Sequence, residues 1–203
     1  MPGSKSSRRW LHEHFSDPYV KKAHKTGARA RAVYKLEELQ ERGKLFKPGM
    51  VVIDLGAAPG SWSEVVAKWV GKTGRVIALD ILPMSPIPGV EFILGDFAKP
   101  SVLDELLKTL GDTKVDWVIS DMAPNISGIV SVDQPRSLEL AELAFDLAQK
   151  VLHRKGGLLV KVFQGEGFDA FLLNLRGCFK KVVIRKPKAS KDRSREVYLL
   201  AKN

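Results

Sequence analysis

The chain has 203 residues, 44% of them hydrophobic, which is enough for one buried core but not for two. It contains no apolar stretch of ~20 residues and no charged start followed by an apolar leader, so we expect neither a membrane span nor a secretory signal. The single cysteine, Cys178, excludes an internal disulfide and favours a reducing, cytoplasmic location.

The net charge of +10 is unevenly distributed. Residues 1–35 hold nine Lys or Arg against two Asp or Glu, and residues 176–195 hold nine against one, so the rest of the chain is net acidic. Two basic flanks on an acidic body are typical of proteins that bind polyanions, because contacts to phosphates supply most non-specific nucleic-acid affinity. The alternative is a solvated tail that aids solubility. We predict that residues 1–28 form a basic RNA-binding extension.

Short β-branched runs alternate along the chain with longer stretches of helical spacing. This alternation predicts an α/β fold with a parallel sheet covered by helices on both faces. Gly156 and Gly157 are expected to end one helix and open the next strand. In chain order, the predicted elements are helix 29–42, strand 50–55, helix 61–70, strands 75–80 and 90–94, helix 101–110, strand 115–120, helix 136–153, strand 157–163, helix 168–176, and strands 179–185 and 196–201.

A glycine turn, DLGAAPG, follows the first predicted strand. Gly56 and Gly60 would let backbone N–H groups approach a ligand closely, and Asp80 ends the next strand, where an acid can accept both ribose hydroxyls of a nucleoside. The turn lacks the middle glycine of the dinucleotide pattern G-x-G-x-x-G, which disfavours a nicotinamide cofactor. S-adenosylmethionine, a nucleoside without phosphate, fits this turn better.

Two further acids follow predicted strands. Asp96 in GDF is placed to face the adenine amine, and Asp121 in SDMAPN lies near the methionine part. Ligands of open α/β sheets bind outside the carboxyl ends of strands, so acids at successive strand ends support one site. The alternative is that such acids only end strands and cap helices.

Lys161 lies inside the apolar run GLLVKVF. A charge there is costly unless it has a partner or a chemical task, so Lys161 is a candidate for handling a proton. The alternative is a structural lysine in an ion pair or with its ammonium group reaching solvent.

Six segments, in order, resemble the bacterial FtsJ/RrmJ family of large-subunit ribosomal RNA ribose 2′-O-methyltransferases: SRRWLHEHFSDPYV, DLGAAPGSWS, LGDF, SDMAPNISG, VKVFQGEGFD and SREVYLLA. The resemblance runs over nearly the whole chain. It implies a class I (Rossmann-like) methyltransferase fold with a seven-stranded, mostly parallel sheet in residues 29–203. It also implies S-adenosylmethionine as methyl donor and a Lys-Asp-Lys-Glu catalytic tetrad. Gly60-Ser61 stands where Gly-Gly is expected in close relatives.

The resemblance assigns roles by motif and implies no metal. The implied tetrad is Lys35, Asp121, Lys161 and Glu196. Together with Gly56 of the glycine turn, the expected cofactor-binding residues are Gly56, Gly60, Trp62, Asp80, Asp96 and Asp121.

A ribose hydroxyl is a poor nucleophile, whereas the sulfonium of the donor is already activated, so catalysis needs alignment and removal of one proton. We expect Lys161 to be the base. A nearby cation such as Lys35, together with partial burial, favours the neutral amine that a base requires, while Asp121 and Glu196 favour the ammonium. In a second version Lys161 mainly orients the hydroxyl and Asp121 holds its amine.

The resemblance implies that the substrate is a uridine in 23S ribosomal RNA on the assembled 50S subunit. We expect the enzyme to be a monomer without a membrane partner. A ribosome assembly factor that keeps the fold and binds RNA without methylating it is the alternative. A nicotinamide-dependent oxidoreductase is disfavoured, because the chain lacks a second phosphate-binding glycine and a His or Tyr constellation for hydride transfer.

Overall fold

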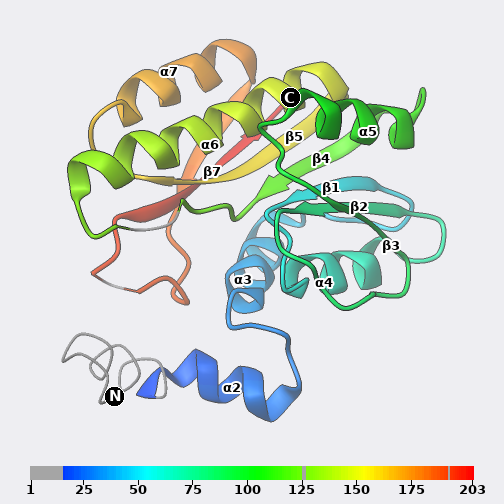
Figure 1. The fold of residues 1–203 in the computed structure, drawn as a ribbon, viewed down its shortest axis with the longest axis horizontal. Coiled ribbons are helices and arrows are strands. Elements are labelled where there is room, and N and C mark those ends of the chain that lie inside the picture. The colour runs from blue at the N-terminus through cyan, green and yellow to red at the C-terminus, as the bar shows by residue number, and fades with distance from the viewer. Residues whose placement is uncertain (1–15, 125–126, 192) are drawn as a thin grey trace.

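A computed structural model describes residues 16–124, 127–191 and 193–203. Its centre is one seven-stranded sheet in the order β3-β2-β1-β4-β5-β7-β6 (Figure 1). The strands are β1 (Val51–Leu55), β2 (Arg75–Asp80), β3 (Val90–Leu94), β4 (Val115–Ser120), β5 (Leu152–Phe163), β6 (Lys181–Arg185) and β7 (Glu196–Lys202). The prediction of a seven-stranded α/β fold is confirmed.

One strand reverses the direction of the sheet. β1 to β5 pair in parallel, whereas β7 lies antiparallel between β5 and β6. The sheet is therefore mostly parallel, as predicted. Because β7 is antiparallel, its first residue, Glu196, lies opposite Phe163 at the carboxyl end of β5. The start of β7 and the ends of the parallel strands thus share one rim of the sheet.

Helices cover both faces of the sheet, with α5, α6 and α7 on one side and α3 and α4 on the other (Figure 1). A shorter helix, α2, lies apart from the sheet beyond α3. The helices are α2 (Pro18–Thr26), α3 (Val33–Gly43), α4 (Ser61–Val70), α5 (Pro100–Leu110), α6 (Val130–Val151) and α7 (Phe168–Cys178).

The two helical layers enclose two apolar cores. Neighbouring residues of a strand point to opposite faces, so Ile53 of β1 joins the core under α5 to α7 and Val52 joins the core under α3 and α4. Trp117 of β4 lies in the second core, and its indole N–H donates to the Leu45 carbonyl at 2.9 Å. A Cβ on Gly157 would lie 2.5 Å from the Trp117 ring, so a larger residue would displace this tryptophan.

The prediction that Gly156 and Gly157 end the helix before β5 is wrong. The helix ends at Val151 and β5 begins at Leu152, five residues before Gly157. His153 contacts Asp116 at 2.9 Å across the strands, which holds the polar start of β5 in the sheet. In the sequence, the basic run from His153 to Lys155 resembles the last turn of a helix, where cations are favoured, and this explains the error.

The start of the same helix also differs from the prediction. α6 begins at Val130 rather than at residue 136 and contains Pro135. Proline is common in the first turn of a helix, which makes Pro135 look like a starting signal. Here Asp133 accepts the backbone N–H groups of Ser127 and Gly128 at 2.8 and 2.9 Å, and this network fastens the segment before Pro135 to the helix.

The N-terminal region contains a helix that the sequence analysis did not predict. Residues 1–15 of the proposed extension lie outside the described residues, and the following part forms α2, capped by Asp17. Ala23 of α2 packs with Tyr34 and Ala189, so α2 contacts the domain. Helix α3 begins at Val33, four residues later than predicted.

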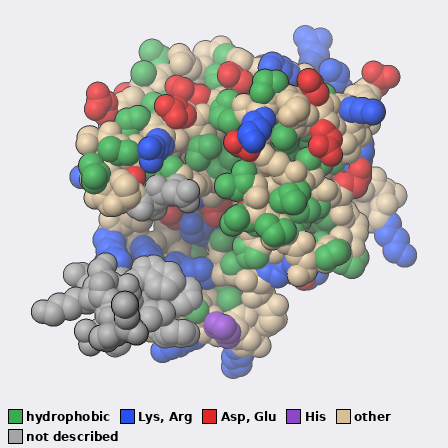
Figure 2. Space-filling model, viewed as in Figure 1, with side chains coloured by type: hydrophobic (Ala, Val, Ile, Leu, Met, Phe, Trp, Pro, Cys, Tyr) green, Lys and Arg blue, Asp and Glu red, His purple; other side chains and the backbone are tan. Residues whose placement is uncertain are grey.

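Charge is unevenly spread over the surface. On the face shown in Figure 2, many Asp and Glu side chains lie over α5 and α6, and Lys and Arg side chains gather below them beside α2. Among the described helices, none combines the length and apolar character that crossing a bilayer requires.

Candidate active site

A cavity of about 370 Å³ lies at the carboxyl ends of β1 to β4. Pockets for small ligands typically measure ~300–1,000 Å³. The chain crosses from β3 to β4 on the other side of β1, and ligands of open α/β sheets bind at such a reversal of strand order. Its lining includes four predicted cofactor residues: Gly56, Asp80, Asp96 and Asp121.

The turn after β1 forms the floor of this cavity. Gly56 has φ of +74°, and a Cβ there would lie 2.5 Å from the Met122 side chain and 3.1 Å from the Met122 Cα. Only glycine fits such a conformation and spacing without displacing the backbone after β4. Glycine at this position therefore lets the turn after β1 pack closely against the segment after β4, and close approach of a ligand at Gly56 stays a prediction.

The two acids at the ends of β2 and β3 hold backbone groups and keep capacity for a ligand. Asp80 accepts the N–H of Ala58 with one oxygen and that of Leu82 with the other, both at 2.8 Å. Asp96 accepts the N–H of Ala98 at 3.0 Å. Each carboxylate oxygen has two lone pairs, so Asp80 can still accept two ribose hydroxyls.

Two predicted cofactor residues lie outside the described lining of the cavity. Gly60 precedes α4 and approaches Ile87 and Met84 of the loop after β2. Trp62 is buried in the core under α3 and α4, where its indole N–H donates to the Ala32 carbonyl at 2.8 Å. Trp62 thus connects α4 to the residue before α3, and Gly60 leaves no room for a side chain beside the loop after β2.

The four residues of the implied tetrad come together at the same rim. Lys161, on β5 and only 7% exposed, contacts Asp121 Oδ1 at 3.0 Å and donates to the Asp121 backbone carbonyl at 2.5 Å. Lys35, on α3 and 9% exposed, contacts Glu196 Oε1 at 2.7 Å and Asp121 Oδ1 at 3.9 Å. Asp121 therefore belongs to both the cavity and this cluster.

Tyr198, which the sequence analysis did not select, completes the cluster. It lies two residues after Glu196 on β7, opposite Lys161, and its hydroxyl donates to Asp121 Oδ1 at 2.6 Å. The signal was available, because the period of two along a strand places residues 196 and 198 on one face.

Two neighbouring lysines keep Asp121 ionised. Burial by itself would raise the pKa of this carboxyl, but Lys161, Lys35 and the hydrogen bond from Tyr198 outweigh burial and hold the pKa below its usual value. Burial, followed by the charges of Asp121 and Glu196, raises the pKa of the Tyr198 phenol well above its usual value. Asp121 is thus a fixed anion and Tyr198 a fixed hydroxyl donor.

Asp54 is a second buried acid, beneath the glycine turn and 1% exposed. Ser63 donates to it at 2.6 Å, but burial, with smaller contributions from the charges of Asp121 and Asp80, raises its pKa from 3.8 to about 7. The folded state therefore binds a proton that the unfolded chain has released between these two pH values.

Replacing Asp54 by Asn should remove this pH dependence. The contribution of Asp54 is fully present below pH 3.8 and is lost as pH rises to about 7. Between pH 5 and pH 7, the free energy of unfolding of the wild type should fall by about 2 to 3 kcal/mol relative to Asp54→Asn. Urea unfolding at both pH values measures this, with the exposed Asp104→Asn as control. Parallel pH curves for wild type and Asp54→Asn would contradict the assignment.

Chemically, the arrangement joins a nucleoside-sized pocket to a buried amine beside a fixed carboxylate. Such a site can hold an activated donor on one side of Asp121 and remove a proton from an acceptor on the other. Within the described residues, no group of three His, Cys, Asp or Glu side chains is placed to hold a metal ion.

Comparison with known proteins gives consistent matches. A family model described as FtsJ-like methyltransferase matches residues 28–203. The ribosomal RNA large subunit methyltransferase E of Cellvibrio japonicus (strain Ueda107) is 60% identical over 202 residues, which cover 100% of this chain and 96% of the relative.

Two solved structures are also similar. A putative ribosomal RNA methyltransferase from Plasmodium falciparum is 32% identical with a TM-score of 0.77, over 86% of this chain and 97% of that chain. Aeropyrum pernix fibrillarin, in complex with natively bound S-adenosyl-L-methionine, is 18% identical with a TM-score of 0.58, over 83% of this chain and 75% of that chain. The second similarity concerns the fold alone.

Proposed function

Because the chain belongs to the FtsJ-like methyltransferase family, we propose that its tetrad and cavity together methylate the ribose 2′-hydroxyl of a uridine in 23S ribosomal RNA. The coarser activity is that of an S-adenosylmethionine-dependent methyltransferase of large-subunit ribosomal RNA. The main observation behind the proposal is that Asp121 both lines the cavity and contacts Lys35 and Lys161.

The cavity would hold S-adenosylmethionine, which supplies a methyl group bonded to a positively charged sulfur. Asp80 would accept the ribose hydroxyls of the cofactor, Asp96 would face the adenine amine, and Gly56 leaves room for close approach. Asp121, a fixed anion at the end of β4, would lie beside the methionine part. Gly60 and Trp62 would act by holding the glycine turn and α4 against α3.

Lys161 would accept the proton of the attacking hydroxyl. The ribose oxygen would bond to the methyl carbon as the donor sulfur leaves as a neutral thioether, and the hydroxyl proton would move to Lys161 Nζ. The ammonium form of Lys161 that pairs with Asp121 has no lone pair, so it would first release a proton to solvent; the neutral amine then has two N–H donors and one lone pair. Its two donors match the two Asp121 oxygens that Lys161 contacts, which leaves the lone pair for the hydroxyl. Lys35 and Glu196 would orient the acceptor ribose.

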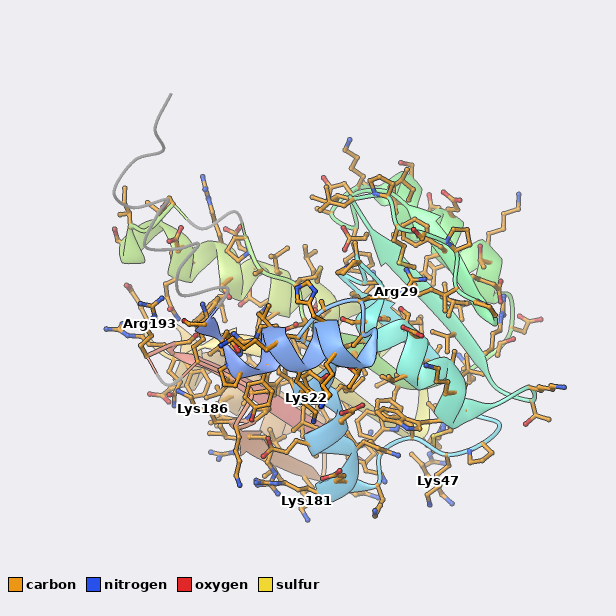
Figure 3. All side chains as sticks on the ribbon, turned by 90° about the horizontal axis from the view of Figure 1, so that it is seen from below. Lys22, Arg29, Lys47, Lys181, Lys186 and Arg193 are labelled. Atoms are coloured by element: carbon orange, nitrogen blue, oxygen red, sulfur yellow. The ribbon has the colours of Figure 1, made fainter. Side chains whose placement is uncertain are left out.

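The RNA would lie across the basic side of the molecule. Figure 3 shows Lys22 on α2, with Lys186 and Arg193 of the β6–β7 loop beyond one end of that helix and Arg29 beyond the other. Residues 1–28 would extend this surface as an RNA-binding extension. We place the enzyme in the cytoplasm as a monomer without a membrane partner, acting on the assembled 50S subunit.

Transfer of tritiated methyl groups tests this function directly. The purified protein should label 50S subunits from cells that lack it, and mapping should place the label on one uridine ribose of 23S RNA. Label on a base, or labelling of free 23S RNA as fast as of 50S subunits, would contradict the proposed acceptor or the proposed particle, respectively. RNA binding without any transfer would indicate an assembly factor instead.

The affinities for RNA and for S-adenosylmethionine should differ in their dependence on salt. Raising KCl from 50 to 200 mM should weaken RNA binding by about a hundredfold or more, because each neutralised phosphate releases counterions. The affinity for S-adenosylmethionine should change less than twofold, since this ligand carries no phosphate and the described cavity lining contains no Lys or Arg. Filter binding and calorimetry measure the two affinities, and equal salt dependence of both would contradict the basic RNA surface.

A further inference from the structure

Ser190 lies one hydrogen bond behind the tetrad. Its hydroxyl donates to Glu196 Oε1 at 2.7 Å, and the same oxygen contacts Lys35 Nζ at 2.7 Å. Ser190 is 4% exposed, so water does not compete freely for this bond. One carboxylate oxygen has lone pairs for both donors.

The Ser190 hydroxyl holds the Glu196 carboxylate, which no backbone contact of Glu196 holds in place. The backbone N–H of Glu196 donates to Ser194 Oγ at 3.2 Å, which holds the main chain but not the carboxylate. A glutamate side chain has several rotatable bonds, and ordering it costs conformational entropy. Lys35 is itself long and flexible, so the Lys35–Glu196 pair needs a rigid third group to hold one geometry.

The segment that carries Ser190 is hydrogen-bonded to α3 and to the turn before it. The Ala189 carbonyl accepts a hydrogen bond from the Arg31 guanidinium, which also pairs with Asp17. The backbone N–H of Lys188 donates to Glu38 of α3 at 2.7 Å. Lys35 comes from the same helix, so the Ser190 segment and Lys35 share one support, and Glu196 of β7 lies between them.

We propose that Ser190 is a positioning residue for methyl transfer: it holds Glu196 so that Lys35 is directed to the acceptor ribose. This inference rests on the proposed function of the tetrad. Ser190 lies outside the described lining of the cofactor cavity, so its loss should change turnover and leave the cofactor affinity unchanged.

Replacing Ser190 by Ala should lower kcat about tenfold, the factor expected from one hydrogen bond to a charged group. The KM for S-adenosylmethionine should stay within twofold. Ser190→Thr retains a hydroxyl and should restore most of the activity. Ser137→Ala is the matched control, because Ser137 is a buried hydroxyl without a hydrogen-bond partner among the described residues. Assays are run where all variants keep the wild-type circular dichroism.

A double-mutant cycle separates positioning from a general structural effect. In a Glu196→Ala background, Ser190→Ala should cost less than twofold further, because the group that it orients is gone. A further tenfold loss in that background, wild-type turnover of Ser190→Ala, or a tenfold rise in cofactor KM would each overturn the inference. Absence of methyl transfer in the wild type would instead contradict the proposed function.

Discussion

Replacing Lys161 by alanine is expected to lower the rate of methyl transfer about a thousandfold, within the ~10²–10⁴ range of general acid–base catalysis. Binding of S-adenosylmethionine should stay within about threefold of wild type, because Lys161 is not part of the described cavity lining. Asp121 keeps the Tyr198 hydroxyl at 2.6 Å and Lys35 at 3.9 Å, so the variant does not leave a buried carboxylate unpaired. Single-turnover transfer to 50S subunits and calorimetry with the cofactor measure the two effects.

Two further variants sharpen this result. Lys155 is exposed at the other end of β5, so Lys155→Ala is a matched control that should keep wild-type turnover. Lys161→Arg preserves the positive charge but cannot lose a proton at neutral pH. If Lys161 is the general base, Lys161→Arg should be as inactive as Lys161→Ala. Recovery of turnover in Lys161→Arg would favour orientation of the hydroxyl, and normal turnover in Lys161→Ala would remove Lys161 from the mechanism.

Replacing Asp80 by alanine should weaken binding of S-adenosylmethionine about a hundredfold. Two hydrogen bonds from ribose hydroxyls to a buried carboxylate contribute on the order of 3 kcal/mol together, and 1.4 kcal/mol corresponds to a factor of ten. Asp80 also accepts two backbone N–H groups, so the variant loses part of the support of the glycine turn. Calorimetric titration with the cofactor measures the affinity.

Comparison variants distinguish lost contacts from lost folding. Asp80→Asn keeps one oxygen and should lose less affinity than Asp80→Ala, while Asp112→Ala, at an exposed turn, should bind as the wild type does. Thermal unfolding without cofactor reports the structural share of the effect. A loss of less than threefold in Asp80→Ala would show that this carboxylate does not hold the ribose.

Much of the fold was predictable because local patterns agree with the tertiary structure. β2, β3, β4 and α4 have the bounds expected from apolar runs and helical spacing. The errors lie where tertiary contacts outweigh local signals. His153 joins β5 through Asp116, a residue distant in sequence. The segment before Pro135 is held to α6 by the Asp133 carboxylate, which accepts backbone N–H groups ahead of the helix. α2 was missed because its polar, basic sequence buries only Val20 and Ala23.

The candidate site was less evenly predictable. The convergence of Lys35, Asp121, Lys161 and Glu196 was expected from the family resemblance, and their mutual contacts agree with that expectation. Four of the six expected cofactor residues line the cavity, whereas Trp62 follows the glycine turn in sequence but turns into the core with α4. Ser190 was missed because its importance depends on side-chain direction, which the sequence does not specify for a loop. Tyr198, in contrast, could have been found from its spacing of two residues from Glu196 on β7.

The placement of β7 between β5 and β6 has a consequence for folding. β6 is made before β7 in the chain but reaches the sheet only through β7. Pairing of β7 with β5 therefore both attaches β6 to the sheet and brings Tyr198 to Asp121 and Glu196 to Lys35. Protection of β7 amides and the gain of enzymatic competence should thus rise with a single time constant during refolding.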